Sequence, residues 1–205
     1  MTTTGDRPTG QWFRGSDGHR WWFDSGALTL DFAYTGGMGD GRREWETLRG
    51  PDDLAAWLTD RFAEVEGTVS EGDLKDALHL RSAIARTATR ASRGETPDPV
   101  DVDVINLYAA TPDIPPALAG GTRQAGRSRA RTGQALSELA RQAVELFAPE
   151  NLDRIRECSA DDCAIVFFDE SRSNNRRWCS MQRCGNRAKV RTHREKERAE
   201  KGTTA

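Results

Sequence analysis

The sequence predicts a mainly α protein of the α+β class, in which an N-terminal β-hairpin and a domain of about four helices precede a small, treble-clef-like, four-cysteine zinc finger. Three observations lead to this prediction. Aromatic residues flank a turn-forming stretch near the N-terminus, apolar residues recur at helical spacing through the middle of the chain, and the four cysteines form two close pairs near the C-terminus. We expect residues 11–148 to form the helical domain and 149–198 the finger, with 1–10 and 199–205 disordered.

Length and composition indicate a soluble chain. Its 205 residues suffice for one good core plus a small metal module, or for two small domains. Hydrophobic residues make up 36% and charged residues 30%, and no apolar run reaches the roughly 20 residues that a membrane helix needs. The N-terminus lacks the apolar run of a signal peptide. We therefore expect a cytoplasmic protein with no membrane partner.

The net charge of −2 conceals a strong asymmetry. From Arg172 onward there are 11 Lys and Arg against 3 Asp and Glu, whereas the preceding residues carry 19 against 29. A basic end on an acidic body is typical of proteins that contact a polyanion locally. A solvated basic tail is the alternative.

Residues 11–32 are rich in aromatic side chains on both sides of Gly15-Ser-Asp-Gly18, which favours a β-hairpin. Leu28, Leu30 and Phe32 alternate and could extend this hairpin, although a helix beginning near Leu28 fits almost as well. The aromatic cluster indicates either a packed core or a ligand pocket. The candidate pocket residues are Trp21, Trp22, Asp31, Tyr34 and Trp45.

Four amphipathic helices follow. The first begins at Pro51 and carries an apolar stripe as far as Gly67, and the second begins at the capping box Ser70-Glu-Gly-Asp73 and ends before Gly94. The third spans about 100–110 and the fourth about 132–147.

Cys158, Cys163, Cys179 and Cys184 form two pairs, with four residues inside each pair and fifteen between the pairs. Four soft thiolates suit tetrahedral Zn²⁺, and paired cysteines in a reducing compartment more often hold metal than form disulfides. All four ligands come from the protein, so the spacing predicts a structural zinc site; disulfide or redox use is the alternative.

Residues 164–168 should form a strand that turns at 170–175 and returns through 176–178, and a helix should begin near Gly185 or Asn186. Arg187, Arg191, Arg194 and Arg198 would share one face of that helix. We expect nucleic-acid contacts from Arg176, Arg177, Arg183, Asn186, Arg187, Lys189, Arg191 and Arg194, with Asn186 or Arg187 reaching base edges.

The run from Arg176 to Arg187, with Cys179-Ser-Met181 and Cys184-Gly-Asn-Arg187, resembles the signature of CGNR zinc-finger proteins. Their usual N-terminal partner is the ABATE domain, associated with stress-induced transcription regulation. Leu28-Thr-Leu-Asp-Phe-Ala-Tyr-Thr35 is similar to a segment of that domain, although Tyr34 stands where the segment commonly carries Asn. The resemblance implies a bacterial, zinc-containing transcription regulator.

Three functions follow as candidates. The favoured one is DNA binding by the finger of a nucleoid-associated regulator, whose N-terminal domain senses a small-molecule effector or mediates assembly, for example as a homodimer. The second is a zinc-stabilised module that docks on an acidic protein partner. The third is a small-molecule enzyme in the Trp-rich domain, which the sequence favours less because it lacks a Walker loop, a dinucleotide glycine fingerprint, His-Glu-x-x-His and Gly-x-Ser-x-Gly.

Overall fold

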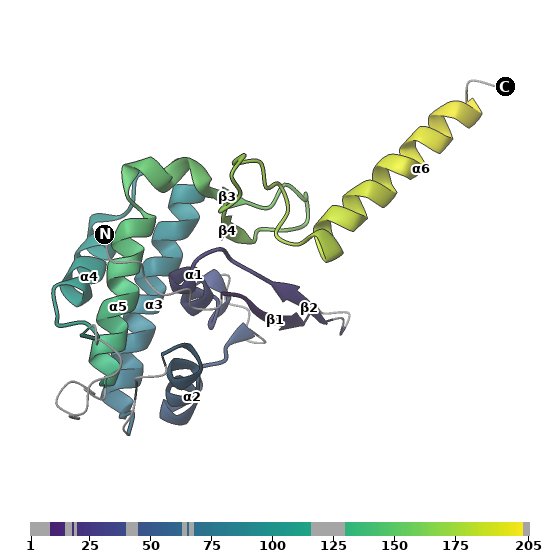
Figure 1. Cartoon of the computed structure of the whole chain (residues 1–205). Helices are drawn as coiled ribbons and strands as arrows, with labels where there is room; N and C mark the ends of the chain where they lie inside the picture. Colours follow the sequence, from purple (N-terminus) through teal and green to yellow (C-terminus); the bar gives the residue numbers. More distant parts are fainter. Residues whose placement is uncertain are drawn as a thin grey trace, which may run out of the picture.

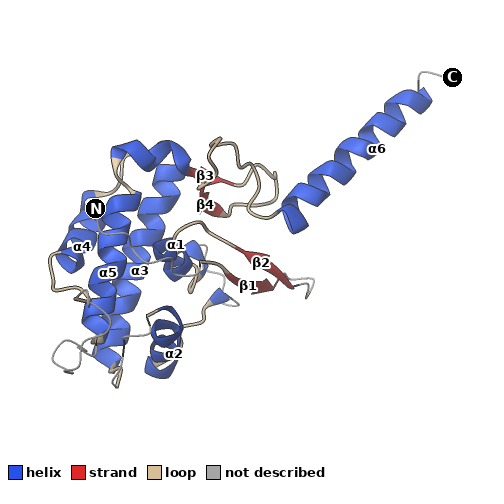
Figure 2. Ribbon diagram, in the orientation of Figure 1, coloured by secondary structure: helices blue, strands red, loops and turns tan. Residues whose placement is uncertain are grey.

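A computed structural model of the chain describes residues 9–14, 18, 20–39, 45–62, 65, 68–115 and 130–202 (Figure 1). The expected disorder of residues 1–8 and 203–205 lies outside this part of the chain. Gly10, which we expected in the disordered N-terminal segment, is buried, and residues 199–202 continue the last helix. Helices dominate the described residues, with two small antiparallel sheets, which confirms the mainly α fold class (Figure 2).

The expected N-terminal hairpin is present. Strands β1 (Gln11–Arg14) and β2 (Arg20–Phe23) pair antiparallel, with Trp12 opposite Trp22 and Phe13 opposite Trp21. Because side chains alternate across a strand, Phe13 and Trp21 enter the core while Trp12 and Trp22 face outward.

Of the two expectations for Leu28 onward, the helix is correct. All six residues of α1 (Leu28–Ala33) are buried. A helix enclosed on every side has no polar stripe, which is why the sequence shows no clear helical period here. The 3-10 turn η1 (Gly37–Gly39) follows, and Gly36 forms an isolated antiparallel bridge with Glu46.

The four expected helices are α2 (Pro51–Arg61), α3 (Glu71–Ser92), α4 (Pro99–Ala109) and α5 (Thr132–Leu146), of which α3, α4 and α5 pack side by side (Figure 2). Helix α2 ends earlier than expected, because Phe62 turns to an extended backbone. The capping box of α3 is formed: Ser70 Oγ accepts a hydrogen bond from Asp73 N, and Asp73 Oδ2 accepts one from Ser70 N.

The C-terminal segment begins with η3 (Pro149–Arg154) and continues through β3 (Ile155–Glu157), β4 (Val166–Phe168), η4 (Met181–Gly185) and α6 (Asn186–Gly202). Strand β4 pairs with β3 upstream, so our expectation of a return strand at 176–178 is wrong. The reason is the turn after β4. Asp169 accepts backbone hydrogen bonds from Ser171 (2.9 Å) and Arg176 (2.7 Å), which bends the chain away from the strand.

One hydrophobic core runs across the expected boundary at residue 148, from Phe13 and Phe32 to Phe167 and Cys184. The Tyr34 hydroxyl donates to Val166 O (2.8 Å) and accepts from Val166 N (2.7 Å) in a buried setting. Phe168 N also donates to Ser25 O (2.8 Å). The metal-bearing segment is therefore packed on the helical domain by main-chain contacts.

Gly26 makes the closest of these approaches. Its φ is +78°, and a Cβ at this position would lie 2.3 Å from Phe168 O, a distance that real Cβ atoms do not show. Glycine is needed here for its backbone conformation and for the contact with β4.

Gly26→Ala should therefore lower the free energy of unfolding by at least about 3 kcal/mol, since it adds a main-chain clash to the roughly 1–2 kcal/mol of a left-handed alanine. Gly94→Ala is the matched control, because Gly94 has φ +70° and no neighbouring atom within 4 Å of its Cβ position. Urea unfolding of both variants would measure the difference. Equal losses would contradict the close packing at Gly26.

Candidate metal centre and nucleic-acid interface

Four cysteine side chains converge where the β3–β4 hairpin meets η4. Cys158 and Cys163 lie in the loop between β3 and β4, Cys179 precedes η4 and Cys184 lies within it. Their sulfur atoms all lie within 4.8 Å of one another, and Cys158, Cys179 and Cys184 are buried. The hairpin and the turn thus bring together ligands that are up to 26 positions apart in the sequence.

The geometry fits a metal ion. The Cys163–Cys179 and Cys179–Cys184 sulfur separations are 3.8 and 3.5 Å. A tetrahedral ion with thiolates at about 2.3 Å would place its sulfurs about 3.8 Å apart. A disulfide needs about 2.05 Å, and all four cysteines are free. The four cysteines expected to form a metal site thus lie close enough together to hold one ion, and they are enough to close its coordination shell.

Hydrogen-bond donors surround the sulfur atoms. Cys179 N donates to Cys158 Sγ at 3.4 Å, and Arg187 Nη2 lies 3.2 Å from Cys184 Sγ. Hydrogen bonds from Cys163 and Cys179 lower the pKa of the Cys158 thiol to about 2, while the same interaction raises the pKa of Cys163 to about 12. Cysteine binds metal as the thiolate, so a bound cation would displace the remaining thiol protons.

Arg187 and Arg191, both expected at the nucleic-acid interface, form ion pairs with the loop between Cys158 and Cys163, which we call the first cysteine loop. Arg187 contacts both carboxylate oxygens of Asp162, at 2.6 and 3.0 Å, and Arg191 lies 2.7 Å from Asp161. Both pairs are exposed, so each contributes little to stability, and both connect the start of α6 to the first cysteine loop. Asp161 and Asp162 are not among the site residues expected from the sequence; the signal for them is an adjacent acidic pair inside a cysteine loop.

Arg176 lies mainly inside the protein. Its guanidinium donates to the carbonyls of Asp24 (2.7 Å), Cys179 (2.7 Å) and Trp178 (3.1 Å), and it lies 4.2 Å from the centre of the Phe167 ring. Burial lowers its pKa from the usual arginine value. These contacts attach the second cysteine pair to the β2–α1 connection.

Arg183 is also partly engaged, since its guanidinium lies 3.8 Å from the centre of the Trp21 ring. Arg177, Asn186, Lys189 and Arg194 are exposed. The expected basic residues thus divide into two groups, one built into the finger and one facing solvent.

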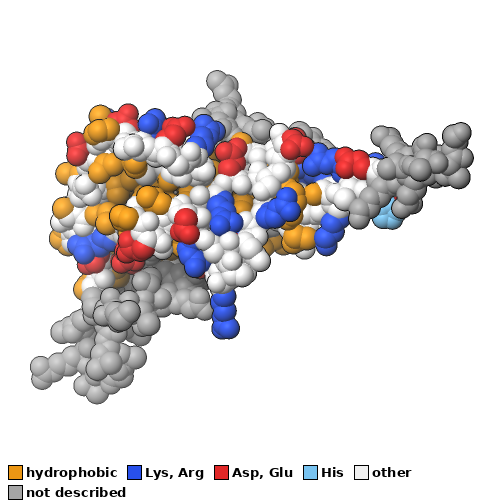
Figure 3. Space-filling model, turned by 90° about the horizontal axis from the view of Figure 1, so that it is seen from above, with side chains coloured by type: hydrophobic (Ala, Val, Ile, Leu, Met, Phe, Trp, Pro, Cys, Tyr) orange, Lys and Arg blue, Asp and Glu red, His pale blue; other side chains and the backbone are white. Residues whose placement is uncertain are grey.

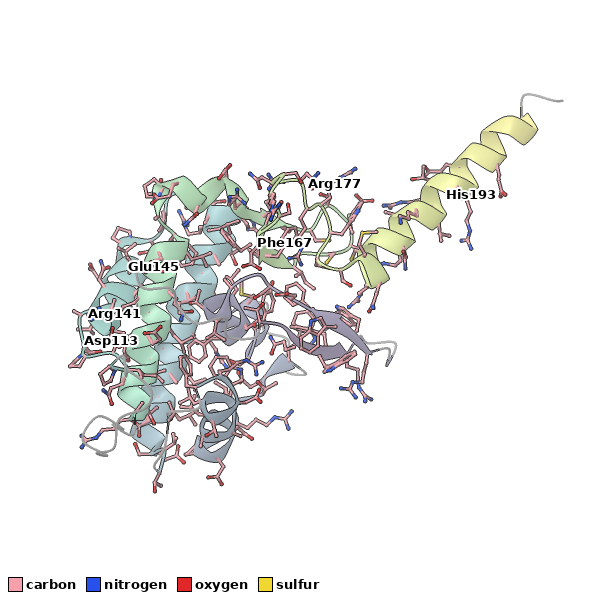
Figure 4. The ribbon with its side chains drawn as sticks, viewed as in Figure 1. Asp113, Arg141, Glu145, Phe167, Arg177 and His193 are labelled. Atoms are coloured by element: carbon pink, nitrogen blue, oxygen red, sulfur yellow. The ribbon has the colours of Figure 1, made fainter. Side chains whose placement is uncertain are left out.

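A groove of about 790 Å³ separates the first cysteine loop from α6. Ser159, Asp161 and Arg177 line one side, and Lys189, Arg191 and His193 line the other. Arg177 and His193 extend outward from the ribbon (Figure 4), and the space-filling view shows Lys and Arg side chains along the described part of α6 with acidic groups among them (Figure 3).

The five candidate pocket residues do not line a common cavity among the described residues. Trp21, Asp31 and Tyr34 are buried in the core, and Trp22 faces outward. Tyr34 and Trp45 line a small cavity of about 40 Å³ beside Cys163 and Arg183, and this cavity has room for a few water molecules at most. The structure therefore supports the packed-core interpretation for Trp21 and Tyr34, whereas Trp22 lies at the surface.

Asp31 is fully buried next to the entry of β1. Its carboxylate accepts hydrogen bonds from Gly10 N and Ser25 Oγ, each at 2.6 Å. Burial raises its pKa from 3.8 to about 6, although these donors act in the opposite direction. Asp31 thus holds Gly10 against the core.

Two family models match the chain. The model ABATE, described as "Putative stress-induced transcription regulator", matches residues 26–150, and the model described as "CGNR zinc finger" matches residues 154–197. The first match covers α1 to α5, and the second covers the four cysteines and most of α6. No curated protein matches the chain. Among the described residues, no helix is long and apolar enough to cross a membrane.

Cys184→Ser should abolish stoichiometric metal binding, because loss of one of four thiolates opens the coordination shell; affinity should fall by more than about 100-fold. Elemental analysis after dialysis should find one metal ion per wild-type chain and far less than one per variant chain. Ser159→Ala, an exposed change in the first cysteine loop, should retain the metal. Full metal content in Cys184→Ser would contradict the assigned ligands.

Asp31 should make stability depend on pH. Its folded pKa, about 6, lies above the usual aspartate value of 3.8, so its contribution to stability is fully present below pH 3.8 and is lost as the pH rises past 6. The shift corresponds to roughly 3 kcal/mol. In urea unfolding, the free energy of unfolding of Asp31→Asn should rise relative to that of wild type by roughly 3 kcal/mol as the pH goes from 4 to 7.5.

Ser25→Ala provides the opposite control, since it removes a donor that lowers the pKa of Asp31 and should therefore lose more stability than wild type over this range. A wild-type minus Asp31→Asn difference that stays constant between pH 4 and 7.5 would contradict the raised pKa.

Proposed function

The chain belongs to the ABATE family and carries a C-terminal CGNR zinc finger, and from this premise we propose that it is a transcription regulator that binds duplex DNA through α6 and the adjoining groove. The observation that carries the proposal is the position of α6. This helix of 17 residues projects away from the body of the protein (Figure 1) and is exposed along most of its described length. An α-helix about 25 Å long fits the major groove of B-DNA.

The exposed basic residues suit contacts with phosphates. Arg177 stands on one wall of the groove, and Lys189 and Arg194 lie on α6. Asn186, exposed at the start of α6, can present both a donor and an acceptor to a base edge. Arg187 and Arg191 would have to exchange their aspartates for phosphates, which makes their contribution to affinity smaller.

Arg176 and Arg183 take a different role in this proposal. Arg176 is held by three backbone carbonyls, and Arg183 lies over Trp21. Both therefore position the finger rather than contact DNA.

We infer that the bound metal is Zn²⁺ with a structural role. Four thiolates form a closed, soft coordination shell, and no position remains for water or substrate. The ion would hold the β3–β4 loop, η4 and the first turn of α6 in one arrangement.

The N-terminal domain is suited to control the finger. Tyr34 contacts β4, and Asp24 contacts Arg176 next to the second cysteine pair, so an effector or a second subunit that moved α1 would also move the metal site. A cytoplasmic location at the nucleoid follows from this function.

DNA binding should weaken with salt. About five phosphate contacts would give a slope near −4.5 in a plot of log affinity against log salt concentration. Lys189→Ala should make that slope shallower by about 0.9 and weaken all duplexes alike, whereas Asn186→Ala should cost roughly 1–3 kcal/mol mainly on a selected site. Fluorescence anisotropy on selected and scrambled duplexes would measure both effects.

Lys75→Ala is the matched control, because it removes the same charge from an exposed position on α3. Absence of duplex binding by wild type at low salt would overturn the proposed function. An equal loss in Lys75→Ala and Lys189→Ala would show that the overall charge, and not α6, governs binding.

A further inference from the structure

Two tryptophans occupy the outer face of the β1–β2 hairpin. Trp12 is 59% exposed and Trp22 is 41% exposed. Their rings meet edge to face, with centroids 5.6 Å apart, and the Arg20 guanidinium lies 5.1 Å from the centre of the Trp12 ring. Large apolar side chains gathered at the surface are typical of an interaction site.

A second groove, of about 560 Å³, separates this hairpin from the finger. Trp22 lines it on the hairpin side, and Trp178 and Met181 line it on the finger side. Met181 is 50% exposed, and the Arg177 guanidinium lies 5.1 Å from the centre of the Trp178 ring. The groove is therefore a largely apolar channel between two aromatic walls.

These contacts form a continuous row, which we call the aromatic ladder: Arg20, Trp12, Trp22, the groove, Trp178 and Arg177. Cations stand at both ends and rings lie between them. Asp24, the acidic residue that lines the groove, already accepts a hydrogen bond from Gly26 N through its carboxylate. Arg20 and Arg177 place a positive charge at each end of the row, and the Asp24 carboxylate lies in the groove between them.

We propose that the aromatic ladder binds single-stranded nucleic acid, with unpaired bases stacked on Trp22 and Trp178 and phosphates placed near Arg20 and Arg177. Alternating rings and cations suit a chain that itself alternates bases and phosphates. A duplex hides the faces of its bases, so it cannot use the rings in this way. An apolar peptide would use the rings but would gain nothing from cations at both ends.

The ladder adjoins the groove proposed for duplex DNA. Arg177 and Trp178 line both grooves, so a strand that leaves a duplex on α6 would reach the ladder without crossing another element. This inference rests on the proposed function only in taking nucleic acid as the class of ligand. Its residues Trp12, Trp22 and Arg20 take no part in the proposed duplex site.

The test uses the full-length, zinc-loaded chain and three fluorescein-labelled probes: a 12-nucleotide oligothymidylate, the matching oligouridylate and a 12-base-pair duplex of mixed sequence. Oligothymidylate should bind and quench tryptophan fluorescence. The double variant Trp12→Ala/Trp22→Ala should bind it at least fivefold more weakly, since a base stacked on an aromatic ring commonly contributes that much or more. Its affinity for the duplex should change less than twofold.

Trp12→Phe/Trp22→Phe keeps the rings and should restore single-strand binding to within about threefold of wild type. Leu107→Ala, an exposed apolar change on α4, should leave binding of every probe unchanged. The ratio between oligothymidylate and oligouridylate affinities identifies DNA or RNA as the preferred strand. If the alanine variant does not fold, the inference is tested by whether oligothymidylate quenches the tryptophan fluorescence of wild type and binds the phenylalanine variant as predicted.

Several results would overturn the inference: single-strand binding unaffected by the alanine changes, binding without quenching, or equal losses on single strand and duplex. Self-association of wild type that disappears in the alanine variant, without oligothymidylate binding, would show that a second copy covers the ladder. If wild type bound oligothymidylate but not the duplex, this result would contradict the proposed function but not the binding of single strands by the aromatic ladder.

Discussion

The placement of the finger depends on one buried hydroxyl group. Tyr34, directly after α1, donates a hydrogen bond to Val166 O and accepts one from Val166 N, which joins segments 132 residues apart in the sequence. Because a hydroxyl both donates and accepts, it satisfies two main-chain groups of β4 that would otherwise be buried without partners.

Around this link the metal site becomes part of the core. Ser25 O accepts from Phe168 N, and Asp24 O accepts from Arg176, whose guanidinium also binds the carbonyl of a metal ligand. The aspartates beside Cys163 then orient the first turns of α6. The direction of the projecting helix thus follows from contacts that begin in the N-terminal domain. A change in α1 has a direct structural route to the proposed DNA-binding surface.

Local patterns allowed much of this to be predicted from the sequence. The aromatic-rich segments of β1 and β2, the capping box at Ser70 and the spacing of the cysteines each specify structure within a short window. The pairing of β4 with β3 could not be predicted, since it depends on how Asp169 folds the following turn. Nor does a sequence show whether an arginine is solvated: Arg176 and Arg177 are adjacent, yet one is held by the core and the other is exposed.

The metal centre and α1 share one core. Hydrogen exchange followed by mass spectrometry, with and without a zinc chelator, tests it most directly. A shared core predicts that removal of the metal raises exchange in β4 and in residues 28–35 together, while the central turns of α3 keep their protection. If the amides of 158–185 lose protection but those of 28–35 exchange as slowly as before, the finger folds as an independent module and the claim is contradicted.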